Sequence, residues 1–351
     1  MSLVCLPMAI ALGLANRRVS LFYKVNCLCV NAFPKAKTKI LQFCNCCARV
    51  MHLTDGLRLR LLHKPKFKRY TYLDITYSSE MNCRLSSRKY KSQNSIVQVG
   101  PFALGGRSLV MMAGPCTIGD EAGLLKTALS VRESGAHILR GGAYKTRTAH
   151  DTFQGLGESA LEMLARVRKN TGMPVVTEIT DVQDLDLIGR YADMLQIGSR
   201  NMQNTVLLKA VGKCRYPVLL KRGFSNTVDE WLAAADYILA GGNEQVILCE
   251  RGIRTFESST RFSLDILSVP VIKNLSHLPV IVDPSHAAGK RELVGAISKA
   301  AIAASADGLL IEVDCSPSTA QVDGRQTITT GQFAKLIPQL RAVAHAVGRE
   351  L

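Results

Sequence analysis

From residue 107 onward, short apolar runs rich in β-branched residues alternate with amphipathic stretches of helical period. Eight such runs occur in order, at residues 109–113, 137–139, 174–177, 194–197, 217–220, 245–249, 279–282 and 308–313. The stretches between them predict helices at residues 121–133, 158–169, 182–191 and 291–304, and a last helix at 332–347. Thr227 followed by Glu230 has the capping-box pattern and predicts the start of another helix.

Continuous apolar strands that alternate with helices indicate a parallel sheet buried on both faces. The region from residue 108 to residue 351 has the usual length of a (β/α)8 barrel, about 250 residues. A doubly wound open sheet is the alternative, but no G-x-G-x-x-G turn follows the first run, and polar residues stand at the carboxyl end of nearly every run. We therefore predict an α/β fold in which residues 96–351 form a (β/α)8 TIM barrel.

The net charge of +16 is concentrated at one end of the chain. Residues 1–98 hold 17 of the 44 Lys and Arg residues but only 3 of the 28 Asp and Glu residues. The predicted barrel is nearly neutral, so the overall charge does not indicate a nucleic-acid partner for it. We predict that residues 1–95 form a basic, poorly structured extension that adds nothing to the chemistry.

Three other interpretations of this extension stay open. Its basic, acid-poor, Ser-containing composition is typical of an organellar transit peptide, which makes an organelle the alternative to the cytoplasmic location that we expect. Basic residues interleaved with Phe67, Tyr70 and Tyr72 would also suit a nucleic-acid-binding tail. Cysteines at 27, 29, 44, 46 and 47 would suit a zinc site, although a clear second pair with the usual C-x2-C spacing is missing. No apolar stretch reaches the roughly 18 residues that span a bilayer, so we expect no membrane partner.

The carboxyl ends of the predicted strands carry a set of basic side chains that we call the cationic rim. Its members are Arg140, Lys145, Arg147, Arg200, Lys221 and Arg251. Any one of them alone would be read as a solvated surface charge. Six at equivalent positions of different strands would repel one another unless an anion lay between them, and guanidinium and ammonium groups bind phosphate well. The rim therefore predicts one or two small phosphorylated substrates.

A second set of residues has the character of metal ligands: Cys116 after the first strand, His286 after the seventh, Glu312 in the eighth and Asp323 in the loop beyond it. The first, seventh and eighth strands become neighbours when a barrel closes, so these four side chains are expected to meet. One thiolate, one imidazole and two carboxylates suit a borderline divalent ion such as Mn, Fe, Zn or Co better than Mg or Ca. A buried apolar cysteine and a loop histidine without a metal are the alternatives.

With these residues in view, the chain resembles the 3-deoxy-D-arabino-heptulosonate 7-phosphate (DAHP) synthases of the type I beta subclass, which are related to 3-deoxy-manno-octulosonate 8-phosphate synthase. The similarity covers roughly residues 96–351 and rests on nine motifs in the same order. They are G-P-C (114–116), L-R-G-G-A-Y-K-T-R-T (139–148), F-Q-G-L-G (153–157), Q-I-G-S-R-N (196–201), L-L-K-R-G (219–223), L-C-E-R-G-I-R-T-F-E (248–257), D-P-S-H (283–286), I-E-V (311–313) and D-G-R-Q (323–326).

The resemblance implies a metal-dependent, aldol-like condensation of phosphoenolpyruvate with erythrose 4-phosphate, the first step of the shikimate pathway to chorismate and the aromatic amino acids. It implies that Cys116, His286, Glu312 and Asp323 hold the metal. It assigns phosphoenolpyruvate to Arg140, Lys145, Ser199, Arg200, Lys221 and Arg251, and erythrose 4-phosphate to Arg147 and Thr148. Lys145 is expected to donate a proton near the reacting carbons, and Glu178 to orient water. Relatives are commonly tetramers, so a homo-oligomer is expected.

This chain departs from the family pattern on the side of the acceptor sugar. Thr146 stands where the family usually has proline in K-P-R-T, and Ala149-His150-Asp151 replaces S-P-Y. The octulosonate relatives carry K-A-N-R-S-S, which is absent here, so we favour erythrose 4-phosphate over arabinose 5-phosphate. The remaining alternatives are the octulosonate synthase and a catalytically silent barrel with a nucleic-acid-binding tail. Neither a ferredoxin-like regulatory domain nor a chorismate mutase domain is recognisable in residues 1–95.

Overall fold

The structure, a computed structural model, describes residues 85–147 and 149–351 together with the backbone of five short strands nearer the amino terminus. The chain divides into two compact units, Met1–Asn82 and Cys83–Leu351. In the first unit, an antiparallel sheet has the order β1-β5-β4, and a separate antiparallel pair joins β2 to β3. These strands are β1 (Ser20–Tyr23), β2 (Cys27–Leu28), β3 (Phe43–Cys44), β4 (Leu57–Leu62) and β5 (Thr71–Tyr77).

The predictions for the extension fall largely outside the described residues. Its disorder, a transit peptide, a nucleic-acid-binding tail and a zinc site all depend on residues, or on side chains, that the structure does not describe. They stay predictions. In the part of the chain that the structure describes, no helix is long and apolar enough to cross a membrane.

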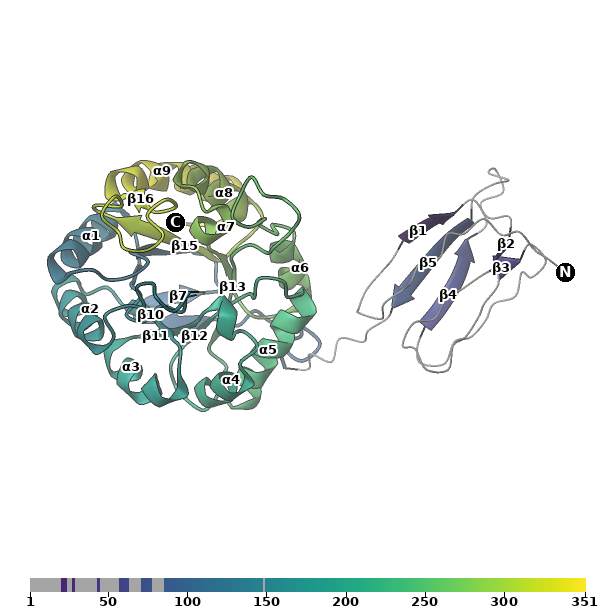
Figure 1. Cartoon of the computed structure of the whole chain (residues 1–351), viewed down its shortest axis with the longest axis horizontal. Helices are drawn as coiled ribbons and strands as arrows, with labels where there is room; N and C mark the ends of the chain where they lie inside the picture. Colours follow the sequence, from purple (N-terminus) through teal and green to yellow (C-terminus); the bar gives the residue numbers. More distant parts are fainter. Residues whose placement is uncertain are drawn as a thin grey trace. The chain divides into compact units, whose positions relative to one another are not determined.

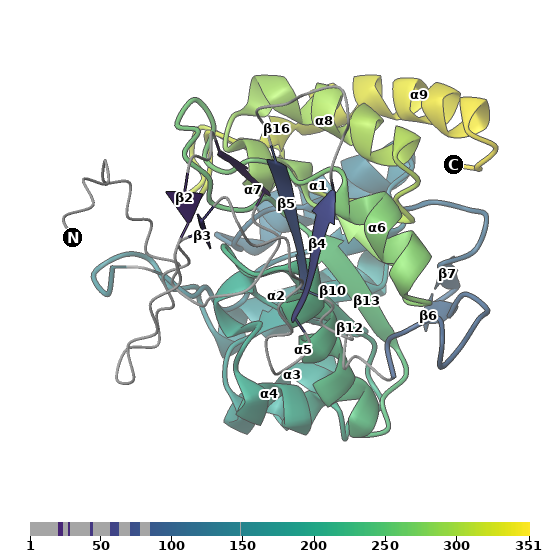
Figure 2. The ribbon, with the colours of Figure 1, turned by 90° about the vertical axis from the view of Figure 1, so that its right-hand side faces the viewer.

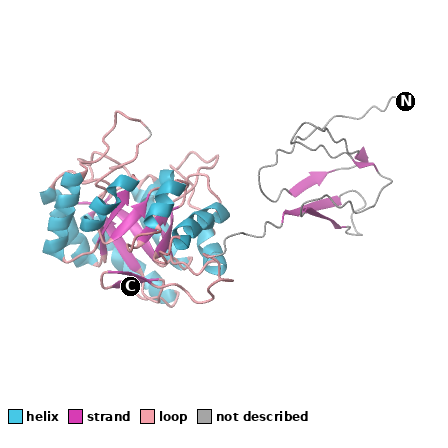
Figure 3. Ribbon diagram, turned by 90° about the horizontal axis from the view of Figure 1, so that it is seen from below, coloured by secondary structure: helices cyan, strands magenta, loops and turns pink. Residues whose placement is uncertain are grey.

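The second unit contains eight parallel strands that close into a barrel, seen end-on in Figure 1 and enclosed by helices in Figure 3. Neighbouring strands pair in sequence order, and β15 pairs with β8 from Gly308 opposite Val110 to Glu312 opposite Gly114. The predicted TIM barrel is therefore confirmed, and each of the eight apolar runs coincides with one strand. The strands are β8 (Val110–Gly114), β9 (Ile138–Arg140), β10 (Val175–Ile179), β11 (Met194–Ile197), β12 (Val218–Lys221), β13 (Val246–Glu250), β14 (Val280–Val282) and β15 (Gly308–Asp314).

Helices cover the outside of the barrel. They are α1 (Glu121–Ser134), α2 (Glu158–Thr171), α3 (Leu185–Tyr191), α4 (Thr205–Val211), α5 (Val228–Ala240), α6 (Ser268–Leu275), α7 (Pro284–Ala288), α8 (Arg291–Ala303) and α9 (Thr330–Ala346). The predicted capping box is present at the start of α5, where Thr227 and Glu230 exchange hydrogen bonds. Because these side chains satisfy backbone N–H groups that a helix start leaves unpaired, the residue pattern alone locates the start of this helix.

A β-hairpin closes the end of the barrel opposite the carboxyl ends of the strands, and the sequence pattern did not predict it. Its strands are β6 (Val97–Val99) and β7 (Phe102–Leu104), which lie at one end of the barrel in Figure 2. Val97, Val99 and Leu104 are almost fully buried and belong to the same apolar cluster as inward-facing residues of the barrel strands, such as Met112. The hairpin therefore extends the core and shields this end of the barrel from water.

The residues just before this hairpin are fastened to the barrel through His277. The Oγ atom of Ser95 lies 2.9 Å from Nδ1 of His277, and the backbone oxygen of Leu85 lies 2.7 Å from Nε2. The backbone N–H of Ser86 donates to Asp236, and the guanidinium of Arg88 donates to a carbonyl at the end of α6. Residues 85–95, which the sequence assigned to the extension, thus pack on the barrel.

This packing predicts different outcomes for two truncations. Removing residues 1–82 is expected to leave the melting temperature and the turnover nearly unchanged. Removing residues 1–95 leaves the buried His277 ring without its two partners, at a cost of about 1–3 kcal/mol, and the melting temperature is expected to fall by several degrees. Thermal melts and initial rates of the full chain and both truncations test this. Equal melting temperatures for the two truncations would contradict it.

Candidate active site

A cavity of about 230 Å³ opens at the carboxyl ends of the barrel strands, the end where barrel enzymes place their sites. Its walls come from the ends of β10, β11 and β12 and from the loops that follow β9 and β11 to β15. They contain Lys145, Thr146, Arg147, Ala149, Thr152, Glu178, Gln196, Gly198, Ser199, Arg200, Lys221, Phe224, Arg251, Arg261, His286 and Asp323. Positive side chains greatly outnumber negative ones in this lining, so the cavity suits anions.

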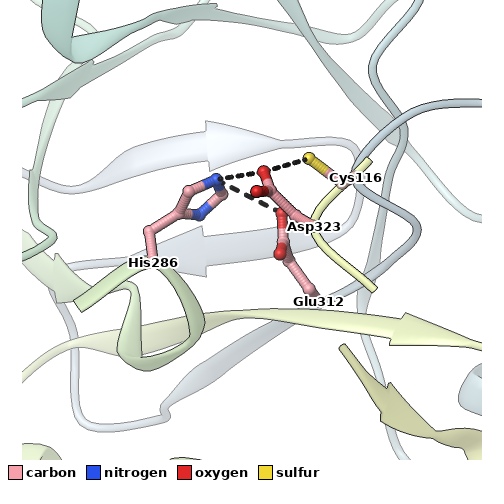
Figure 4. A group of neighbouring side chains, drawn as sticks. All are labelled: Cys116, His286, Glu312 and Asp323. Carbon is pink, nitrogen blue, oxygen red and sulfur yellow. Dashed lines mark hydrogen bonds and ion pairs between the residues drawn. The ribbon is translucent and has the colours of Figure 1, made fainter. Parts of the chain in front are cut away.

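The four predicted metal ligands meet at the floor of this cavity. One ligand atom from each of Cys116, His286, Glu312 and Asp323 lies within 4.8 Å of all the others. Nε2 of His286 lies 3.3 Å from Oε1 of Glu312 and 3.7 Å from Oδ2 of Asp323, and Sγ of Cys116 lies 3.2 Å from that same Oδ2 (Figure 4). The four side chains point toward one another, and three of them are buried.

The closure of the barrel explains why residues so far apart in the sequence converge. Cys116 follows β8 and Glu312 lies in β15, and these two strands pair with Gly114 opposite Glu312. His286 lies in α7, the short helix after β14. Asp323 lies in the loop between β15 and β16 (Ile328–Thr329), and its φ of +59° is a conformation that few residues other than Gly, Asn and Asp adopt.

Further polar groups fix the orientation of these ligands. Asp283 caps α7 and accepts a hydrogen bond from Nδ1 of His286 at 2.7 Å, which leaves Nε2 directed at the other three ligands. The guanidinium of Arg140 donates to Oε1 of Glu312 at 2.7 Å, and the Gln326 amide donates to the other carboxylate oxygen. A carboxylate that holds the second ring nitrogen is a common companion of a metal-ligating histidine.

Burial controls the protonation of these groups. It lowers the pKa of His286 to about 4 despite the nearby Asp283, so the imidazole is neutral at neutral pH, as a ligand must be. Burial, with the nearby Glu312, raises the pKa of the Cys116 thiol, so its thiolate requires a positive charge beside it. Although burial disfavours the ammonium of Lys145, the nearby Cys116 and Glu312 raise its pKa, and Nζ lies 2.8 Å from Sγ of Cys116.

The structure brings most of the cationic rim into the cavity wall. Lys145, Arg147, Arg200, Lys221 and Arg251 all line it, as do the predicted Ser199 and Glu178. Arg140 does not: it is buried behind the cavity against Glu312. Lys221 donates to Asp283 at 2.6 Å, so it connects the rim to the histidine. Thr148 lies outside the described residues.

Sequence reasoning did not single out several residues that shape the site. Arg261 lines the cavity and donates to both Asp323, at 3.1 Å, and Gln326, at 3.0 Å. It lies in a long polar loop after β13, where no strand end or motif marked it. Phe224 also lines the cavity, and its only signal was an aromatic residue shortly after a strand. Asp283 stood in the D-P-S-H motif without an assigned role.

Comparison with known proteins agrees with this geometry. Residues 92–348 match the model of the DAHP synthetase I family. The chain belongs to the DAHP synthetase I family. It is 46% identical to phospho-2-dehydro-3-deoxyheptonate aldolase of Thermotoga maritima over 265 residues, which cover 76% of this chain and 78% of that protein. As the sequence predicted, this chain is an enzyme, a DAHP synthase.

A solved structure and a second kind of relative complete the comparison. The crystal structure of the Thermotoga maritima DAHP synthase superposes with a TM-score of 0.74 at 39% identity, covering 84% of this chain and 91% of that one. The 2-dehydro-3-deoxyphosphooctonate aldolase of Syntrophotalea carbinolica is 30% identical over 257 residues, which cover 68% of this chain and 92% of that protein. The predicted relationship to both kinds of synthase is therefore confirmed, and the DAHP synthase is the more similar of the two.

The close approach of Gly198 to Glu178 yields a prediction about catalysis. A Cβ atom at position 198 would lie 2.1 Å from Oε1 of Glu178, which also contacts Thr146 and, through its other oxygen, Gln196. Gly198→Ala is therefore expected to displace this carboxylate and lower kcat by about tenfold or more while the fold is retained. Steady-state rates and thermal melts measure the two effects.

The matched control is Gly331→Ala in the first turn of α9, where the nearest atom to the added Cβ lies 3.9 Å away. It should leave kcat unchanged and stabilise the helix slightly. A Gly198→Ala enzyme with the wild-type kcat would show that the position of Glu178 does not matter to the reaction.

Proposed function

We propose that this cavity condenses phosphoenolpyruvate with erythrose 4-phosphate to form DAHP and phosphate. The observation that carries the proposal is the meeting of a metal-type ligand cluster and a cationic wall in one cavity. Phosphoenolpyruvate bears a carboxylate and a phosphate, and erythrose 4-phosphate bears a second phosphate at one end and a reactive aldehyde at the other. A site for the pair needs several cations and one electrophilic centre, and this cavity has the cations and a ligand cluster that can hold a metal ion.

The four-residue cluster fits a divalent metal ion. Three kinds of donor converge, the imidazole is neutral, and Asp283 orients it. This donor set suits Mn, Fe, Zn or Co better than Mg or Ca. An ion held by Cys116, His286, Glu312 and Asp323 would supply Lewis-acid polarisation of the aldehyde oxygen.

The rim residues are proposed to hold phosphoenolpyruvate. Lys221 and Arg251 are buried in the cavity wall, and Ser199 and Arg200 follow β11 on the same wall. Buried cations bind anions more strongly than exposed ones because less water screens them. Arg140 supports this site from behind by pairing with Glu312. It thereby fixes a ligand carboxylate, in addition to the role in holding phosphoenolpyruvate that the family resemblance implies.

Lys145 and Glu178 are proposed to act on protons and water. The ammonium of Lys145 lies between the ligand cluster and the open cavity, 3.5 Å from Asp323, with a pKa that keeps it charged. It can donate a proton to the aldehyde oxygen, which gains negative charge as the new carbon–carbon bond is made. Glu178 is held by Thr146 and Gln196 on the cavity wall, where its carboxylate can orient an attacking water molecule.

The acceptor side is assigned to Arg147 and Thr148. Arg147 lines the cavity next to Thr146, the residue that replaces the usual proline, and its Nε donates to Thr152 at 3.1 Å. This hydrogen bond restrains the loop. A proline at position 146 would restrain it through its fixed φ. The homo-oligomer that the family implies stays a prediction, as does the cellular location.

One assay separates this function from the octulosonate alternative. Purified protein is mixed with phosphoenolpyruvate and either erythrose 4-phosphate or arabinose 5-phosphate, and phosphate release is followed with a chelator and after metal is restored. We expect release with erythrose 4-phosphate, its loss with the chelator and its return with metal. Preference for arabinose 5-phosphate would favour the octulosonate synthase, and no release with either sugar would refute the proposal.

A further inference from the structure

Two phenyl rings are stacked at the edge of the cavity. The centroids of Phe224 and Phe262 lie 5.2 Å apart and their planes differ by 13°. Phe224 follows β12 and lines the cavity, whereas Phe262 lies in the loop after β13 and is buried. The face of an aromatic ring carries partial negative charge, so a stacked pair offers ring faces to cations.

Four guanidinium groups surround this aromatic pair. Arg251 contacts both rings, with its central carbon 4.0 Å from the centroid of Phe262 and 4.9 Å from that of Phe224. Arg200 lies 5.2 Å and Arg254 5.1 Å from the Phe224 centroid, and Arg261 lies 5.5 Å from that of Phe262. All five distances are within the range of a cation–π interaction.

Backbone hydrogen bonds hold the aromatic pair where three loops meet. The N–H of Arg254 donates to the carbonyl of Phe224 at 2.7 Å, joining the loops after β12 and β13. The backbone N–H groups of Ile253 and Ser263 each donate to the carbonyl of the other residue. The N–H of Phe262 donates to the carbonyl of Ala287 in α7, the helix that contains His286. The rings therefore belong to a connected frame rather than to a freely moving loop.

The aromatic pair lies beside a cation, Arg251, whose burial in the cavity wall is electrostatically costly. Burial lowers the pKa of Arg251 to about 10 even though the nearby Asp283 raises it, which shows that the charge of Arg251 is costly where it stands. Arg251 is also nearly inaccessible to water, and its hydrogen bond to the carbonyl of Gly252 is long, at 3.3 Å. Besides the field of the nearby Asp283, the two rings stabilise this cation, and they do so without occupying its hydrogen-bond donors as a contacting carboxylate would.

We propose that Phe224 and Phe262 are positioning residues that hold Arg251 and Arg200 ready for the phosphorylated three-carbon acid. This inference rests on the proposed function, because it takes phosphoenolpyruvate as the anion between these arginines. A carboxylate partner would also hold the guanidinium groups, but it would neutralise their positive charge. An aromatic partner leaves the charge and the hydrogen-bond donors of Arg251 available to the substrate.

The test measures binding of phosphoenolpyruvate alone to the metal-loaded full chain by titration calorimetry, alongside turnover. Phe262→Leu and Phe224→Leu are each expected to raise the Kd for phosphoenolpyruvate about tenfold, which corresponds to ~1.4 kcal/mol. The KM for phosphoenolpyruvate should rise in parallel, while kcat at saturation and the KM for erythrose 4-phosphate change less than about twofold. Phe262→Tyr keeps the ring and should bind like the wild type.

Phe102→Leu is the matched control. Phe102 packs against the apolar cluster at the opposite end of the barrel, so its loss should lower the melting temperature without changing the Kd. Wild-type affinity in both leucine variants would overturn the inference, as would equal losses in Phe262→Tyr and Phe262→Leu. If Phe262→Leu does not fold, Phe224→Leu, whose ring is only partly buried, decides the question. Turnover by the wild-type protein tests the proposed function separately. If the wild type turns over normally, wild-type affinity in the leucine variants contradicts only the inference about the two rings.

Discussion

His286→Ala is expected to lose bound metal and activity together, with kcat/KM falling by about a thousandfold. The imidazole is the only nitrogen donor among the four clustered ligands, and Lewis-acid catalysis contributes several kcal/mol to reactions of this kind. The fold should survive, because Asp283 keeps its bond to Lys221 when the ring is removed. Metal content by mass spectrometry, initial rates and a thermal melt of the metal-free protein measure the three effects.

The control for this variant is His345→Ala, a histidine near the end of α9 and outside the cavity. It should retain both metal and rate. Full activity of His286→Ala, or full metal content in a His286→Ala protein that is inactive, would refute the assignment of this residue as a ligand.

Lys145→Gln is expected to separate catalysis from metal binding. The ammonium contacts Cys116 and Asp323 but is not itself a ligand, so about one metal ion per chain should remain bound. A positioned proton donor contributes roughly 10²–10⁴-fold to a rate, and we expect kcat to fall by that amount. The measurements are metal stoichiometry and single-turnover rates with saturating substrates.

Lys299→Gln provides the comparison, since this lysine lies on α8 and bonds only to Gln339 on the protein surface. It should behave as the wild type. If Lys145→Gln kept its rate, the proposed proton donor would be wrong. If it lost all metal, Lys145 would instead serve mainly to keep the Cys116 thiolate ionised.

Much of the site followed from the sequence because strand ends in a parallel barrel share one end of the molecule. Cys116, His286, Glu312 and Asp323 were expected to meet, and they do. Arg140 shows where this reasoning stopped. Its position at the end of β9 placed it in the rim, but its guanidinium is paired with Glu312 in β15, the strand on the far side of the neighbouring β8. A strand end determines the location of a residue, not the direction of a long flexible side chain.

The residues before the barrel illustrate a second limit. The acid-poor composition of residues 1–95 suggested one uniform extension, yet residues 85–95 bind to His277 and Asp236 in the barrel. Composition is an average over a segment, so it cannot reveal hydrogen-bond partners that lie more than a hundred positions away in the sequence. The hairpin of β6 and β7 was missed for a related reason: two runs of three residues are too short for a periodicity to show.

The sequence by itself determined the order of strands and helices, the closed parallel barrel and the chemical types gathered at its mouth. Hydrophobic period and capping residues act over a few positions and need no knowledge of the fold. The tertiary structure alone decided which cations line the cavity, that Arg140 pairs with Glu312, and that Phe224 stacks on Phe262. These are contacts between separate loops, and they depend on distances that exist only after the barrel has closed.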